Sequence, residues 1–446
     1  MKSILIQNAR IIDPAEKIDQ TGSLLIDGGK IAWMGKTGGK PPASDFSVIQ
    51  ADNLVACPGF VDLHCHLRDP GFEEKETIAT GTMAAARGGF TTVCCMPNTE
   101  PPIDNQATVD YVKQKAAEEG LVRVLPIGCI TRGRKGEALA EMGELAQAGV
   151  VAFSDDGNSV MNSRLMRQAL DYSRAFGLPV IEHCEDKVLT DGGQMNEGIV
   201  STRLGLPGMP AAAEESIIAR DIALTELTGA QLHVAHVSTA GGVEMIRAAK
   251  ARGLRVTAEV TPHHLTLTDL RVMGYDTNAK VNPPLRTAGD IQALIAGLKD
   301  NVIDAIATDH APHTEVEKLC EFAYAPFGIS VLETALGMLL GLVHAGQIDL
   351  NLLISKLTWE PAKIIGARYG RLGTLAVGSR ADVTLIDPSR EWVVDPCAFA
   401  SKGRNTPLAG AAMRGKVVAT FYRGSPVYQD ESVKLVAGNG VKTGAV

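Results

Sequence analysis

The chain has 446 residues, of which 4% are aromatic, and a formal net charge of −8 without a basic cluster. This composition argues against a nucleic-acid partner, because such proteins carry basic patches and aromatic side chains on which bases stack. The first residues become polar too soon for a signal peptide, and no apolar run is long enough for a membrane span. The eight cysteines lack paired-ligand spacing, which predicts reduced, mostly buried thiols in a cytoplasmic protein.

The two ends of the chain share one texture. Residues 4 to about 56 alternate apolar and polar side chains between turn signals, which predicts short strands. Similar strands are predicted for residues 381–386, 392–394 and 416–422. Because the middle of the chain has a different pattern of apolar and polar residues, we expect residues 1–57 and 367–446 to combine into one small β-sandwich domain.

The middle of the chain, residues 58–366, alternates apolar β-type runs with helical patterns, which is typical of βα units with a parallel sheet. Strands are predicted at residues 59–64, 90–95, 122–129, 149–153, 179–183, 231–237, 255–260 and 302–308. Eight such units favour an α/β fold with a (β/α)8 TIM-like barrel. An open doubly wound sheet is the alternative, but no Gly-x-Gly-x-x-Gly motif opens a first helix.

Histidine and acidic residues gather at the carboxyl ends of these predicted strands. His64 and His66 end the first strand, and their spacing places both rings on one side of it. The later strand ends carry Asp155-Asp156, His183, His236, His263-His264 and Asp309-His310. Only His344, among ten histidines, lies in a clearly helical stretch. Because the carboxyl ends of barrel strands meet at one rim, this convergence predicts a metal site.

Imidazole and carboxylate groups are the ligands that zinc and similar cations prefer. Five residues exceed the needs of one structural zinc: His64, His66, His183, His236 and Asp309. A sixth ligand, from either Asp155 or Asp156, would bridge two metals. His233 is expected to be packed or to point outward, Cys184 is expected in the core, and His263 and His264 are given no ligand role. Arg68 and Asn98 are poor metal ligands, but Arg68 offers a planar fork for a carboxylate and Asn98 offers amide donors.

The strand-end motifs together resemble those of the amidohydrolase superfamily, and within it the chain is similar to the bacterial type I dihydroorotases over nearly its whole length. The resemblance is carried by Asp62-Leu63-His64-Cys65-His66-Leu67-Arg68-Asp69-Pro70-Gly71, Met96-Pro97-Asn98-Thr99, Phe153-Ser154-Asp155-Asp156-Gly157, Glu182-His183-Cys184-Glu185-Asp186, His236-Val237-Ser238, and Ala307-Thr308-Asp309-His310-Ala311-Pro312-His313.

This resemblance implies two divalent metal ions, Zn²⁺ in the first place, and a reversible hydrolysis of L-dihydroorotate to N-carbamoyl-L-aspartate in pyrimidine biosynthesis. It implies that His64, His66 and Asp309 hold one metal and that His183 and His236 hold the other, with Asp156 as the bridge. Asp309 is also implied as the catalytic proton acceptor. The implied substrate contacts are Arg68, Asn98, Asn282, His313, Phe327 and Gly328.

Other readings of the same residues stay open. An allantoinase, a hydantoinase or a dihydropyrimidinase would share the barrel and the metals, although Arg68 and Asn98 argue against the last two. A dihydroorotase-like scaffold subunit of aspartate transcarbamoylase is a non-enzymatic alternative, against which the intact ligand set argues. A complex with aspartate transcarbamoylase and assembly into a homo-oligomer are expected partnerships, and the substrate is expected to be a small molecule.

Overall fold

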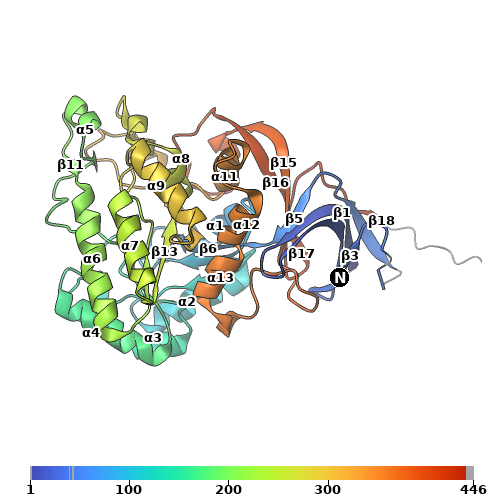
Figure 1. The fold of residues 1–446 in the computed structure, drawn as a ribbon, viewed down its shortest axis with the longest axis horizontal. Helices are drawn as coiled ribbons and strands as arrows, with labels where there is room; N and C mark the ends of the chain where they lie inside the picture. The colour runs from blue at the N-terminus through green and yellow to red at the C-terminus, as the bar shows by residue number, and fades with distance from the viewer. Residues whose placement is uncertain (1–2, 40, 43–44, 438–446) are drawn as a thin grey trace, which may run out of the picture.

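The central part of the chain forms the predicted barrel (Figure 1). The computed structural model describes residues 3–39, 41–42 and 45–437. The wall of the barrel is made of parallel strands, which pair in the orders β6-β7-β8 and β9-β12-β13-β14. These strands are β6 (Phe60–Cys65), β7 (Phe90–Cys95), β8 (Arg123–Pro126), β9 (Val180–Glu182), β12 (Leu232–Val234), β13 (Val256–Val260) and β14 (Ala305–Ile306).

Single residue bridges, rather than full strands, close the ring at two places. Phe153 pairs with Gly128 on one side and with Val180 on the other, so the predicted strand over residues 149–153 is reduced to a short bridge. Cys65 pairs with His310 in parallel, which joins the end of the barrel to its beginning. The barrel is therefore closed, and the open-sheet alternative is excluded.

Helices cover the outside of the barrel, as Figure 1 shows for α6, α7 and α9. Thr77, Asn105 and Thr239 begin α1, α2 and α7 by accepting hydrogen bonds from free backbone N–H groups of the first turn. Among the described residues, no helix has both the length and the apolar character needed to cross a bilayer. The helices are α1 (Ile78–Arg87), α2 (Gln106–Glu119), α3 (Met142–Ala148), α4 (Ser163–Ser173), α5 (Ile199–Leu204), α6 (Ala211–Thr228), α7 (Ala240–Ala251), α8 (Pro262–Thr266), α9 (Ala288–Lys299), α10 (Glu315–Lys318), α11 (Ala335–His344), α12 (Leu350–Leu357) and α13 (Trp359–Ile365).

Both ends of the chain join in one sheet, at the right of Figure 1, as the sequence predicts. The order is β17-β16-β15-β5-β1-β2-β3, and β4 and β18 extend from β1. Because β5 pairs with β1 on one side and with β15 on the other, the two chain ends meet at β5. The strands are β1 (Ser3–Asp13), β2 (Ile18–Asp27), β3 (Lys30–Lys36), β4 (Phe46–Gln50), β5 (Val55–Pro58), β15 (Val383–Val393), β16 (Ala412–Tyr422), β17 (Ser425–Gln429) and β18 (Val436–Ala437), and a separate pair, β10 (Met195–Asn196) and β11 (Gly208–Met209), lies beside the barrel rim.

This sheet has an apolar core of its own. Ile6, Ile11, Leu24, Leu385 and Phe421 are buried in one cluster that draws on strands from both chain ends. On this basis we propose the division of the chain into a composite domain, residues 1–57 and 367–446, and a barrel domain, residues 58–366. Residues 1–2, 40, 43–44 and 438–446 of the composite domain lie outside the described residues.

A buried ion pair links the sheet to the barrel. Arg123 in β8 donates from both terminal nitrogens to one carboxylate oxygen of Asp382, at 3.1 Å each, and also to the hydroxyl group of Thr92. Arg123 is only 7% exposed. If Arg123 is removed, Asp382 keeps its charge in a site without a cation to neutralise it, which is the costly way to break a buried pair.

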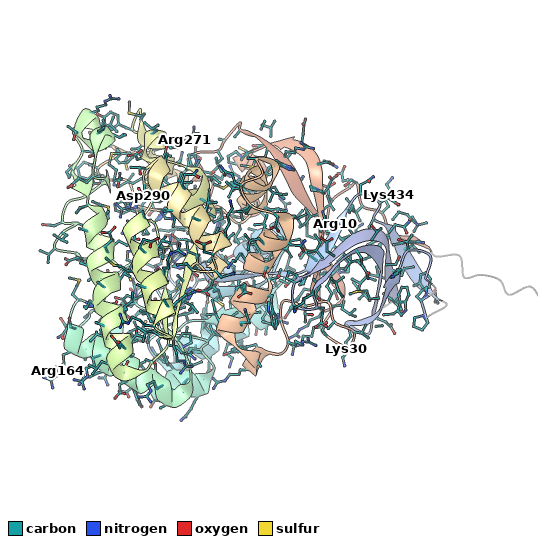
Figure 2. All side chains as sticks on the ribbon, viewed as in Figure 1. Arg10, Lys30, Arg164, Arg271, Asp290 and Lys434 are labelled. Atoms are coloured by element: carbon teal, nitrogen blue, oxygen red, sulfur yellow. The ribbon has the colours of Figure 1, made fainter. Side chains whose placement is uncertain are left out.

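We therefore expect Arg123→Met to lower the free energy of unfolding by about 3 kcal/mol, measured by denaturant unfolding. The matched control is Arg10→Met, because Arg10 (labelled in Figure 2) pairs with Asp19 at 2.8 Å on the surface of the sheet. An exposed pair of this kind contributes less than about 1 kcal/mol. Equal losses in the two variants would show that the link between the two parts of the fold does not depend on this pair.

Candidate metal centre

The two histidines at the end of β6 face two carboxylates from other strand ends. The Nε2 atom of His64 lies 3.4 Å from Asp156 and 3.5 Å from Asp309, and the Nε2 atom of His66 lies 3.6 Å and 3.1 Å from the same two carboxylates. All four side chains are buried. The structure therefore brings residues from three separate segments of the barrel rim to one point.

Two further histidines, which follow β9 and β12, also approach Asp156. The Nδ1 atom of His183 and the Nε2 atom of His236 lie 3.6 and 3.5 Å from the same oxygen, Oδ1 of Asp156, and 3.0 Å from each other. Asp156 thus belongs to two groups of possible ligands, one with His64 and His66 and one with His183 and His236. A carboxylate shared in this way is suited to bridge two cations.

The donor set fits divalent metal ions. Two of the facing atoms, His64 Nε2 and Asp156 Oδ1, are buried and have no hydrogen-bond partner among the described residues. Such unpaired polar atoms are costly in a protein interior. Ligands about 2.0–2.2 Å from a tetrahedral metal lie roughly 3.4 Å from one another, which is close to the spacings around Asp156. A divalent cation would satisfy both atoms at once.

Side chains behind the rings fix their orientation. Glu259 lies 2.8 Å from Nδ1 of His64, Asn98 lies 2.8 Å from Nδ1 of His66, and Glu185 lies 3.0 Å from Nε2 of His183. Bonds of this kind select the ring nitrogen that faces the metal. Glu259 and Glu185 were not predicted from the sequence. Glu185 stands in a quoted motif two residues after His183, whereas Glu259 stands far from every predicted ligand along the chain and carries no comparable signal.

Buried charge at this rim is balanced by the same contacts. Burial by itself would raise the pKa of the Asp309 carboxyl group, but the neighbouring His64 and His66 hold that pKa below its usual range. Burial likewise opposes ionisation of Glu259, yet its bonds to His233 and His64 lower its pKa to about 2. Both carboxylates are therefore ionised at neutral pH, and Asp309 presents its negative charge to the cavity.

The two neighbouring aspartates play different parts in the structure. Asp155 points away from the histidines, because its Oδ1 atom accepts hydrogen bonds from the backbone nitrogens of Ile130 and Thr131 at 2.9 and 3.0 Å. Asp156 points toward them. The choice between Asp155 and Asp156, which spacing alone left open, is thus supported by geometry in favour of Asp156. Asp155 holds the loop that presents Asp156.

Backbone strain is concentrated at the rim. Arg68, His236 and Asp309 have φ values of 63°, 32° and 46°, a region that side chains with a Cβ rarely adopt. Strand alternation from His64 through His66 predicts that Arg68 shares their face, but this prediction is wrong, because β6 ends at Cys65. Arg68 reaches the site through its left-handed backbone instead.

A cavity of about 690 Å³ opens above these residues. Every residue assigned a site role from the sequence lines it except His64, which lies beneath. The lining includes His66, Arg68, Asn98, Asp156, His183, His236, Asn282, Asp309, His313, Phe327 and Gly328. Lys187 and residues 190–193 line the remaining side and had no predicted role.

One wall of the cavity carries an arginine without an acidic partner. The Nε atom of Arg68 donates to the carbonyl oxygen of Pro312 at 3.3 Å, and one terminal nitrogen lies 3.4 Å from His313. No carboxylate of the described residues lies within ion-pair distance of it. Burial lowers the pKa of Arg68 to about 10, which leaves the guanidinium charged at neutral pH. Opposite, the Phe327 carbonyl oxygen lies 2.9 Å from Nε2 of His313.

The remaining histidines near the rim belong to neither of these two groups of possible ligands. His233 is buried and bonds to Thr257 and Glu259, so it is packed, one of the two arrangements expected for it. His264 bonds to Thr261 and to the carbonyl oxygen of Pro283. His263 is buried, and neither of its ring nitrogens has a partner among the described residues. Cys184 lies in the core, as predicted.

Comparisons with known proteins point to one family. A family model described as dihydro-orotase-like matches residues 53–241. The chain is 54% identical over 433 residues to the dihydroorotase of Pelotomaculum thermopropionicum, with 97% of this chain and 100% of that protein covered. It is 52% identical over 427 residues to the dihydroorotase of Citrifermentans bemidjiense, with 96% and 100% covered.

Solved structures show the same fold. The L-hydantoinase (dihydropyrimidinase) of Arthrobacter aurescens superposes with a TM-score of 0.84 at 26% identity, with 99% of each chain covered. The dihydropyrimidinase of Brevibacillus agri has a TM-score of 0.83 at 24% identity, with 98% of this chain and 97% of that chain covered, and at this identity it shows the fold alone.

The geometry around Asp156 makes a prediction about metal content. Asp156→Ala removes the carboxylate that both groups of possible ligands share, so we expect elemental analysis to find most of the metal lost. Asp155→Ala is the matched control, because it removes the neighbouring carboxylate and leaves that of Asp156 in place. It is expected to retain more metal. The reverse result, an empty site in Asp155→Ala and a full one in Asp156→Ala, would refute the bridging role.

Proposed function

The chain belongs to the dihydroorotases of the amidohydrolase superfamily, and on that premise we propose that it hydrolyses the cyclic amide of L-dihydroorotate reversibly to N-carbamoyl-L-aspartate. It is a hydrolase acting on carbon–nitrogen bonds of cyclic amides. Its relatives carry the dihydroorotase name at 52–54% identity over 96–97% of the chain, whereas the similar hydantoinase structure is only 26% identical. The hydantoinase alternative is therefore not favoured.

The observation that carries the choice of substrate is the position of Arg68. Its charged guanidinium faces the cavity beside the metal ligands, and no carboxylate of the described residues pairs with it. A charge in such a place requires a partner of opposite sign from the ligand. Dihydroorotate carries a carboxylate, whereas hydantoin, dihydrouracil and allantoin do not.

The rim residues are suited to hold two divalent metals, which we propose are Zn²⁺ because imidazole and carboxylate oxygen are its usual partners. His64, His66 and Asp309 would hold one ion and His183 and His236 the other, with Asp156 between them. Metals bound there would lower the pKa of water from about 16 to about 7 and polarise the amide carbonyl group.

The chain's own residues then position the substrate and move one proton. Arg68 and His313 would bind the substrate carboxylate. Asn98 uses one amide atom to hold His66 and keeps its other amide atom for a substrate group. Asp309, 3.1 Å from His66 and facing the cavity, would accept a proton from the attacking water. It would then deliver this proton to the ring nitrogen as the carbon–nitrogen bond breaks.

The other assigned contacts frame the ring of the substrate. Asn282 is held by a bond from its amide nitrogen to Glu185, at 3.0 Å. The backbone of Phe327 and Gly328 is held by His313 on one side and by the carbonyl oxygen of Lys280 on the other.

We further propose assembly into a homo-oligomer and a complex with aspartate transcarbamoylase, which size measurements with and without that partner would test.

The proton-transfer role predicts the effect of Asp309→Asn. This change keeps the shape of the side chain and removes its basicity, so we expect the rate of dihydroorotate hydrolysis to fall by much more than about tenfold. Circular dichroism should show an unchanged fold. A variant that keeps more than about a tenth of the wild-type rate, at equal metal content, would contradict this role.

The carboxylate-binding role predicts a selective effect of Arg68→Met. The methionine keeps an apolar stem and deletes two charge-assisted hydrogen bonds, so kcat/KM for dihydroorotate should fall at least about 100-fold. Metal content should not change, because Arg68 faces no ligand atom within bonding distance. Any weak turnover of dihydrouracil or hydantoin should change far less. A parallel fall for charged and uncharged substrates, or no fall, would remove the support for dihydroorotate.

A further inference from the structure

We propose that Asn405, which lies in the chain between β15 and β16, is a positioning residue of the substrate cavity. It holds together the two barrel segments that carry His313 and Gly328. The identity of the substrate in this proposal rests on the proposed function, whereas the geometry of the two segments does not. The proposal assigns part of the cavity to the carboxyl-terminal region rather than to the barrel alone.

The amide group of Asn405 makes four hydrogen bonds, all to these two segments. Its oxygen accepts from the backbone nitrogen of His313 at 2.9 Å and from the hydroxyl group of Ser330 at 2.8 Å. Its nitrogen donates to the carbonyl oxygens of Ala311 at 3.0 Å and Gly328 at 3.1 Å. Two accepted and two donated bonds are all that an asparagine amide can make.

These bonds add to a direct link between the two segments, the hydrogen bond from the backbone nitrogen of Ala311 to the carbonyl oxygen of Ile329 at 2.9 Å. Gly328 has a φ of 146°, and a Cβ atom there would lie 2.7 Å from the carbonyl oxygen of Ala311 and 2.9 Å from the ring of His313. The segments therefore approach each other as closely as their backbones allow. Because one buried amide bonds to both of them, a change in that amide moves His313 and Gly328 relative to each other.

The chain around Asn405 is itself anchored to the barrel. The backbone nitrogen of Ala400 donates to Glu333 at 2.9 Å, and the hydroxyl group of Ser401 donates to Glu76. Gly403 packs so tightly that a Cβ atom would overlap with Pro312. On the other side, Arg271 (labelled in Figure 2) donates to the carbonyl oxygen of Pro407. Residues 400–407 are therefore fixed against the barrel, and they hold Asn405 at the rim.

Neither aspartate nor alanine can make the four bonds of Asn405. An aspartate would keep the two accepted bonds but would place a negative charge against two carbonyl oxygens. An alanine would remove the partner of four polar groups, which belong to Ala311, His313, Gly328 and Ser330. This loss is costly because Asn405 is buried, with 3% of its surface exposed. The backbone of His313 would then lose the bond that holds its imidazole at the cavity wall.

The test compares Asn405→Ala with Thr406→Val. Thr406 is equally buried in the same segment, but among the described residues its hydroxyl group has one hydrogen-bond partner, the backbone nitrogen of Leu408. We expect Asn405→Ala to raise KM for dihydroorotate at least about tenfold with kcat changed less than about threefold, because His313 contributes binding that ground and transition states share. Metal content should equal that of the wild type. Thr406→Val should leave KM unchanged.

A merely structural role would give another pattern. Partial unfolding lowers kcat through the active fraction and leaves KM alone, so that result overturns the proposal. Should Asn405→Ala fail to fold, Ser330→Ala deletes a single bond to the amide and is expected to raise KM about threefold. An unchanged KM in a folded Ser330→Ala variant would then overturn it.

A second readout separates this inference from the proposed function. Hydrogen exchange of the metal-loaded protein should be at least about tenfold faster in residues 311–313 and 328–330 of Asn405→Ala than in Thr406→Val. This result does not require any substrate. Wild-type protein that binds metal but does not turn over dihydroorotate would refute the proposed function, whereas unchanged exchange would refute the role of Asn405.

Discussion

Buried polar groups that cannot satisfy one another are the constraint on which this structure depends. Four imidazole rings and two carboxylates meet at the barrel rim, and the facing atoms of His64 and Asp156 have no partner among the described residues. Leaving such groups unpaired costs about 1–3 kcal/mol each. Divalent cations bound there would remove this cost, so stability and chemistry would both depend on the same atoms.

The surrounding barrel keeps those atoms aimed at one another. Glu259 and Glu185 bond to the ring nitrogens of His64 and His183, and Asp155 holds the loop that presents Asp156. The backbone at His236 and Asp309 is held in a conformation that costs about 1–3 kcal/mol per residue. A rigid wall of paired strands can sustain this strain. The strained residues lie just beyond the strand ends, where the backbone leaves the strand direction.

The composite sheet contributes more than a cover for the barrel. Its core draws on both chain ends, and Arg123 and Asp382 tie it to the barrel wall. The chain between β15 and β16 runs back to the rim and brings Asn405 between the segments of His313 and Gly328. The cavity wall therefore depends on a contact between His313 and Asn405, which are 92 residues apart in the chain.

The sequence by itself determined the barrel, the composite sheet and the strand ends where the ligand candidates lie, because the two-residue period of a strand and the alternation of strand and helix patterns can be read along the chain. Only the tertiary structure decided which atoms meet. Glu259 approaches His64 across 195 residues of sequence, and Asn405 approaches His313 across 92. Asp155 and Asp156 are adjacent in the chain yet point to different partners. Arg68 enters the cavity through a left-handed backbone that strand alternation does not anticipate. Such contacts depend on how distant segments pack, and local patterns carry no record of that packing.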